Sequence, residues 1–149
     1  MITHHHRHRV RYRECDRMGI VYYVHFLDHF EAARTELIRS RGLSYKQIED
    51  SGILMPVVRV DIRYRKPAYY DDVLDVKTIV LEPPSTRLEL LTEIRREDES
   101  EILVAGRTTL CFVDRDRGRP IRAPEFFVEA LAWEPGQDGL LDKDAFGKH

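Results

Sequence analysis

The sequence predicts an α+β fold in which an antiparallel sheet of about five strands curls round one long helix. Two observations support this prediction. Apolar residues recur at steps of three and four between Val24 and Arg41, which is the period of an amphipathic helix. After residue 57 the pattern changes to alternation and to long strand-like runs separated by short turns. Because the helix must bury its apolar face, the sheet is expected to wrap round it.

The first elements are expected in the order strand, turn, helix. An extended segment over Arg9–Glu14 leads into a turn over Asp16–Gly19, and the long helix follows from about Val24. Gly42 then ends this helix as a C′ glycine. Ser44, with Gln47 three residues later, has the spacing of a capping box and predicts a short helix that ends near Ser51.

The strands are expected in the second half of the chain. Apolar residues at 58, 60, 62 and 64 alternate with charged ones, which predicts a strand with one buried face and one solvent face. Pro124 can open a short final helix that runs to Leu131. Between these elements lie three runs longer than an average strand, namely Val73–Leu81, Arg87–Arg96 and Ile102–Val113.

Length and composition limit the organisation and the partners. At 149 residues the chain is expected to form one domain over residues 1–135, with a loose tail over 136–149. A formal charge of −2 offers no bulk attraction to nucleic acid, and no apolar run is long enough to span a bilayer. The start of the chain lacks the apolar region of a secretory signal, and its two cysteines show no framework spacing, so a cytoplasmic protein with reduced thiols is expected.

The segment Tyr12–Tyr23 carries the strongest indication of chemistry. It places Asp16 and a glycine turn immediately before the long helix. A carboxylate there can act as a base or as a nucleophile, while the free N–H groups of the helix start favour an anion that forms in front of them. These are the two halves of an acyl-transfer site. Spacing alone favours the simpler interpretation of Asp16 as an ordinary turn or N-cap aspartate.

Other candidate groups carry weaker arguments. Cys15 is a poor candidate nucleophile because Glu14 and Asp16 on either side disfavour its thiolate. His25 and His29 lie four residues apart on one helix face, as zinc ligands do, but Asp16 is the only evident third ligand and the pattern lacks other support. No metal is therefore expected. The histidines at positions 4, 5, 6 and 8 are interpreted as adventitious metal binders without a function.

In register and order, several motifs resemble the 4-hydroxybenzoyl-CoA thioesterase-like, or YbgC-type, acyl-CoA thioesterases, which have the hot-dog fold. The resemblance covers about Arg9 to Leu131. Its signature residues here are Asp16, Gly19, Val21, Tyr22, Phe26, Phe30, Glu31 and Arg34, followed by Val57–Val60, Tyr64–Ala68, Asp71–Asp72, Gly118–Pro120 and Pro124.

The resemblance implies an acyl-CoA thioesterase that needs no metal or organic cofactor and releases a carboxylic acid and free CoA. Asp16 would attack the thioester carbonyl or activate a water, and the backbone N–H near Tyr23 would hold the oxyanion. His25 stands where many members have asparagine, so it either orients Asp16 or simply caps the helix. The expected substrate contacts are Gly19, Val21, Tyr22, Phe26, Val57 and Val58, with Arg65 and Lys66 as contacts to CoA phosphates.

The same resemblance implies a homodimer or homotetramer in which a second chain completes the site. Three alternatives remain open at this stage: an acyl-ACP thioesterase acting on an acyl carrier protein, a hot-dog dehydratase, and a non-catalytic acyl-thioester binding or scaffold protein. The basic residues 59, 63, 65 and 66 also have a simpler interpretation as a solvated strand face. The acyl group stays open, because aromatic rings accept aromatic and fatty chains alike.

Overall fold

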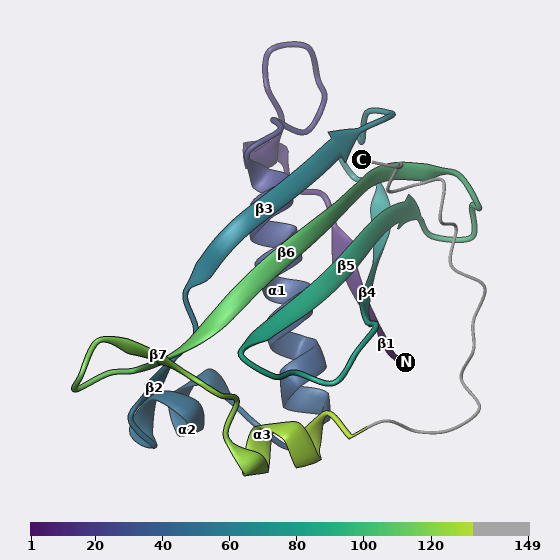
Figure 1. The fold of residues 1–149 in the computed structure, drawn as a ribbon. Coiled ribbons are helices and arrows are strands. Elements are labelled where there is room, and N and C mark those ends of the chain that lie inside the picture. Colours follow the sequence, from purple (N-terminus) through teal and green to yellow (C-terminus); the bar gives the residue numbers. More distant parts are fainter. Residues whose placement is uncertain (133–149) are drawn as a thin grey trace.

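A computed structural model of the protein describes residues 1–132, so the tail predicted at 136–149 lies outside the described residues. The helix α1 (His25–Ser40) lies lengthwise across one face of an antiparallel sheet (Figure 1). Two short helices, α2 (Tyr45–Asp50) and α3 (Glu125–Ala130), pack at one end of α1. The strands are β1 (Ile2–Arg9), β2 (Ile53–Leu54), β3 (Val57–Tyr64), β4 (Val73–Val80), β5 (Arg87–Arg96), β6 (Ile102–Asp114) and β7 (Arg119–Ile121).

The long strands form one continuous sheet in the order β1-β4-β5-β6-β3. All of these pairings are antiparallel, and β6 is long enough to pair with β3 over its first part and with β2 and β7 near its end. The strands β4, β5 and β6 run consecutively as the predicted meander. The curled sheet with one long helix confirms the predicted hot-dog architecture.

The apolar stripe of α1 is buried as its spacing predicts. Phe26, Phe30, Ala33 and Leu37 are each at most 3% exposed. At the centre of the sheet the helix comes so close to β6 that a Cβ atom built on Gly106 would lie 2.5 Å from the Phe30 ring and 2.9 Å from the carbonyl oxygen of Asp61. Gly106 is therefore the position at which the sheet accommodates the helix.

The first strand differs from the prediction. The predicted extended segment over residues 9–14 is wrong: β1 runs from Ile2 to Arg9, and Tyr12–Glu14 forms a single 3₁₀ turn, η1. The strand contains four histidines and two arginines and so lacks an apolar alternation, but its whole length pairs with β4. Sheet pairing, rather than side-chain pattern, defines this strand. The N-terminal histidines are consequently part of the folded domain.

Strand β3 also differs, because neither of its faces is buried in the single chain. Val57, Val58, Val60 and Tyr64 are 41–51% exposed, where a buried face was expected. The physical reason is position: within residues 1–132, β3 pairs only with β6 and forms an edge of the sheet, where Ile62 reaches the core cluster of Phe26 and Phe30 but the valines do not. The alternation of apolar residues is genuine, but it marks an uncovered surface.

No helix within residues 1–132 is both long enough and apolar enough to cross a membrane.

Candidate active site

Asp16 lies in a tight loop between η1 and α1. Its N–H donates to the carbonyl oxygen of Ile20 (2.9 Å), and its own carbonyl oxygen accepts from the N–H of Gly19 (3.0 Å). Gly19 has a φ of +77°, a conformation that side-chain-bearing residues rarely adopt. A bridge between Cys15 and Val21 closes the loop. The predicted turn is confirmed, and it holds the backbone of Asp16 at both hydrogen-bonding groups.

The carboxylate of Asp16 is held by one further contact. The N–H of Met18 donates to Oδ1 at 2.8 Å. Within residues 1–132 no side chain or backbone group bonds to Oδ2, and the residue is only half-buried. One oxygen is thus oriented by the turn while the other is available to a substrate or a water.

The connection between β3 and β4, residues 67–72, fastens this loop to the sheet. The N–H of Val21 donates to the carbonyl oxygen of Ala68 (2.8 Å), and Ile20 forms a bridge with Tyr69. The segment is held in turn by Arg96 of β5, which donates to Oδ2 of Asp72 (2.9 Å) and to the carbonyl oxygen of Pro67 (2.7 Å). The candidate catalytic loop therefore has a rigid support.

The start of α1 supplies free backbone donors next to this loop. The N–H of Tyr22 bonds to the carbonyl oxygen of Glu14 (2.8 Å), and that of His25 bonds to Tyr22 (3.0 Å). The N–H groups of Tyr23 and Val24, by contrast, find no acceptor in the part of the chain that is described. Such orphan donors, together with the positive end of the helix dipole, can stabilise an oxyanion.

Aromatic side chains cover the surface beside these donors. Tyr22 and Tyr23 are in edge contact at 4.9 Å between ring centroids, and the ring of Tyr64 from β3 lies 6.0 Å from Tyr23 and 5.9 Å from Phe26. The three tyrosines are each about half exposed, whereas Phe26 is 3% exposed. Tyr64 belongs to a family motif but was not predicted as a site residue, because only the pairing of β3 brings it to the helix start.

The other predicted substrate contacts divide into groups. Val21, like Phe26, is a core residue that supports the aromatic surface from beneath. Val57 and Val58 lie at the opposite end of β3 from Tyr64, roughly 23 Å away at the usual strand rise, so one chain does not bring them to Asp16. Arg65 and Lys66 are exposed at the end of β3, where Lys66 lies 3.7 Å from Glu101.

His25 is not joined to Asp16. Its Nδ1 atom lies 3.4 Å from Oδ2 of Asp28, one turn further along α1, and no contact with Asp16 occurs among the described residues. The contact with Asp28 fits the interpretation of His25 as a residue of the helix start. No described contact supports its interpretation as a group that orients Asp16. His25 as an orienting residue stays a prediction.

A buried polar cluster next to the loop was missed by sequence reasoning. Nε2 of His8 lies 3.0 Å from both carboxylate oxygens of Glu14, and Nε2 of His29 lies 2.8 Å from Oε1. Burial and, to a smaller extent, the neighbouring His8 together lower the pKa of His29 to about 4. Burial acts to raise the pKa of Glu14, but hydrogen bonds from Arg11 and His8 outweigh it and hold that pKa below the ordinary value.

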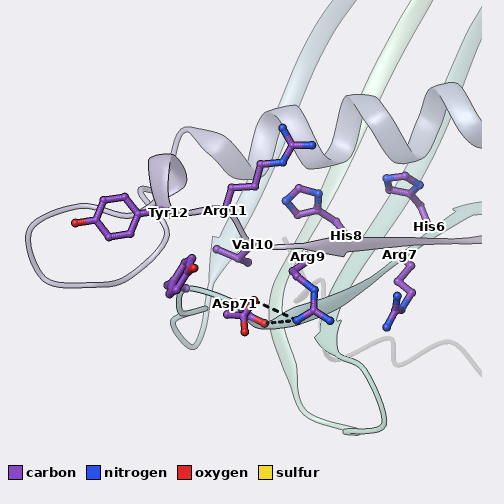
Figure 2. A pocket seen from close by; sticks show the side chains of 9 residues that line it. His6, Arg7, His8, Arg9, Val10, Arg11, Tyr12 and Asp71 are labelled. Atoms are coloured by element: carbon purple, nitrogen blue, oxygen red, sulfur yellow. Dashed lines mark hydrogen bonds and ion pairs between the residues drawn. The ribbon is translucent and has the colours of Figure 1, made fainter.

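The signal for this cluster was present but hidden. His29 was paired with His25 by helical spacing, and His8 was set aside with the other N-terminal histidines. Figure 2 shows His6 and His8 directed from β1 toward the helix, while Arg7 and Arg9 point to the other side. Period-two alternation would have placed His8 on the helix-facing side if residues 2–9 had been assigned to a strand.

Substituting Cys15 with alanine is expected to leave catalysis within about threefold of the native rate, because its thiolate is disfavoured. Burial raises the pKa of the Cys15 thiol, and the charges of Glu14 and Asp16 raise it further. The measurement is kcat/KM for thioester hydrolysis, alongside alkylation of the native protein by iodoacetamide. A large loss of activity in the folded variant, together with rapid alkylation of Cys15, would identify a thiol enzyme instead.

Comparisons with known proteins show which family this chain resembles. The family model of the thioesterase-like superfamily matches residues 10–131. The acyl-CoA thioester hydrolase YbgC of Escherichia coli is 27% identical over 120 residues, which cover 80% of this chain and 89% of that protein. The protein YneP of Bacillus subtilis is 45% identical over 69 residues, which cover 46% of this chain and only 50% of that relative.

A solved structure extends the likeness to three dimensions. The DHNA-CoA thioesterase from Staphylococcus aureus superposes with a TM-score of 0.81 at 32% sequence identity, covering 88% of this chain and 89% of that one.

Proposed function

Because this chain belongs to the thioesterase-like superfamily, as the sequence resemblance predicted, we propose that it hydrolyses acyl-CoA thioesters to a carboxylic acid and free CoA. The observation that carries this proposal is the arrangement of Asp16. Its carboxylate is held through one oxygen in a turn, and this turn leads to two N–H groups at the start of α1 that have no acceptor within residues 1–132. We place this activity in the cytoplasm, where acyl-CoA is made and reduced cysteines persist.

The chemistry follows from these groups. Asp16 either attacks the thioester carbonyl carbon, expelling CoA thiolate and leaving an acyl-aspartyl anhydride for water to cleave, or removes a proton from a water that attacks the same carbon. In both routes the carbonyl oxygen gains negative charge. The N–H groups of Tyr23 and Val24 are the donors available to hold it.

The test of the function is the release of free thiol from a panel of acyl-CoAs. The panel contains short, long and aromatic acyl groups, because the exposed rings of Tyr22, Tyr23 and Tyr64 offer a flat apolar surface. The DHNA-CoA thioesterase among the structural relatives is a further reason to include aromatic members. The same acyl groups on an acyl carrier protein distinguish the CoA from the ACP activity. Tight binding without thiol release would support the scaffold alternative.

We propose further that the active form is a homodimer joined through β3. Among the described residues its second edge has no partner strand, and its valines and Tyr64 form an exposed apolar surface. If two copies of β3 pair antiparallel about their middle, Val57 of one copy comes opposite Tyr64 of the other, and Val58 comes opposite the neighbouring Arg63. The predicted contacts that one chain separates by the length of a strand would then meet at the site.

Replacing Val58 with aspartate is expected to dissociate the dimer and to lower kcat/KM at least about tenfold, since a buried charge at an interface costs several kcal/mol. Light scattering after size-exclusion chromatography gives the mass. Phe126→Asp is the matched control, because Phe126 is 38% exposed on α3, at the far end of α1 from the site. A native protein that is monomeric and fully active would contradict the proposal.

A further inference from the structure

The cluster of His8, Glu14 and His29 joins three elements of the fold. His8 comes from β1, Glu14 from η1 and His29 from α1. Their ligand-type atoms all lie within 4.8 Å of one another. His29 and Glu14 are each 5% exposed, while the side chain of His8 is 23% exposed and forms the solvent side of the cluster. The site is built by tertiary packing and does not arise from one local motif.

Hydrogen bonding within the cluster is incomplete. Oε2 of Glu14 accepts from the backbone N–H of Arg11 at 2.6 Å, and both carboxylate oxygens face His8. Nε2 of His29 lies 2.8 Å from Oε1, yet it is buried without a hydrogen bond of acceptable geometry. A buried ring nitrogen without a hydrogen bond destabilises the fold unless another group becomes its partner. Its nitrogen is aimed into the space between the three residues.

We propose that His8, Glu14 and His29 bind a divalent transition-metal ion of the zinc class. Two imidazole nitrogens and one carboxylate oxygen are a common ligand set for such ions, and bonds of 2.0–2.1 Å in a tetrahedron place ligand atoms about 3.3 Å apart. The contacts of 2.8 and 3.0 Å to Glu14 are close to this spacing. The ion replaces the poorly directed contact of His29 with a coordination bond.

A groove gives the ion access and a fourth coordination position. The groove has a volume of about 490 Å³, and its walls include His8, Glu14 and His29, with Ala32 and the pair His25 and Asp28 along α1. Water from this groove can fill the remaining position. Arg11 and Arg13 also border the groove, and their positive charge opposes a cation. The electrostatic field of these two arginines repels the ion, so only the coordination bonds to the three ligands hold it.

The ion has a structural role at this place. It cross-links β1, η1 and α1 immediately before the catalytic loop, where the carbonyl oxygen of Glu14 also receives the N–H of Tyr22. Asp16 is not a ligand, so hydrolysis needs no step on the metal. The inference stands independently of the proposed thioesterase activity, and its readout is binding and stability.

The test uses the full chain after removal of metals with EDTA and exchange into chelator-free buffer. Zn²⁺ is added while heat and stoichiometry are followed by calorimetry, and Co²⁺ is added as a spectroscopic probe. We expect one ion per chain in this site, the visible absorption of four-coordinate Co²⁺, and a rise in Tm of about 5 °C at saturating Zn²⁺. A native protein that binds neither ion and shows no change in Tm would overturn the inference.

Variants separate this site from the other N-terminal histidines. His29→Gln and His8→Gln are expected to lose the Co²⁺ absorption and the rise in Tm. His5→Gln is the matched control, because His5 lies on the opposite face of β1 and contacts Asp75 at 2.9 Å; it is expected to bind as the native chain does. His8 has a partly exposed side chain, so its variant decides the matter if His29→Gln fails to fold. Unchanged binding in His8→Gln, or loss in His5→Gln, would overturn the inference.

Discussion

Asp16→Asn is expected to lower kcat/KM for thioester hydrolysis by a factor of about 10² to 10⁴, since an amide is neither a nucleophile nor a base. The substitution is a sharp test because the side-chain oxygen of asparagine can still accept the N–H of Met18, as Oδ1 of Asp16 does at 2.8 Å. The turn is preserved and only the carboxylate is lost. Tm is therefore expected to stay within about 2 °C of the native value.

Asp50→Asn is the matched control for this experiment. Asp50 makes an exposed ion pair with Lys46 on α2, remote from the loop, so the same chemical change there is expected to leave hydrolysis unaltered. Both variants are assayed with the best acyl-CoA of the panel, with and without EDTA. If Asp16→Asn keeps the native rate, Asp16 is an ordinary turn residue. If EDTA abolishes the activity of the native protein, the metal ion takes part in the reaction.

Gly106→Ala is expected to destabilise the protein by about 2–3 kcal/mol, because a methyl group at this position overpacks the core. The new Cβ would lie 2.5 Å from Cε2 of Phe30 and 2.9 Å from the carbonyl oxygen of Asp61, so the helix or the sheet must move. Strand propensity alone predicts the opposite sign, since glycine is unfavourable within a strand. Urea unfolding monitored by circular dichroism gives the free energy of unfolding.

The cause can be isolated by a double-mutant cycle with Phe30→Leu. A smaller side chain at position 30 removes the ring that Cβ would meet, so Gly106→Ala should cost at least about 1 kcal/mol less in that background. The backbone oxygen of Asp61 remains close, which limits the rescue. A stabilising effect of Gly106→Ala in the native background would show that α1 does not press on the sheet at this point.

Several features followed from local sequence because their causes are local. The helix of residues 25–40 is set by its apolar period, and the capping box of Ser44 and Gln47 forms as its spacing predicts. The turn at Asp16 depends on Gly19, whose positive φ needs no long-range contact. The strands β4, β5 and β6 were predicted to within one residue, since each is long and separated by clear turn residues.

Features that depend on long-range pairing were misjudged. Strand β1 consists largely of histidine and arginine, and only its pairing with β4 makes it a strand. The alternation in β3 was correctly recognised, but an edge position leaves its apolar residues exposed, which pattern alone does not reveal. Both errors concern which neighbour a strand has, and a single sequence carries little information about that.

The sequence by itself determined the fold class, the turn that carries Asp16 and the family, because helix period, turn chemistry and motif order are all properties of neighbouring residues. Only the tertiary structure decided how distant residues meet. It brings Tyr64 to the helix start and places His8, Glu14 and His29 in one buried cluster from three elements. The physical reason is that such contacts arise from sheet register and from helix packing on the sheet, which the whole chain settles together.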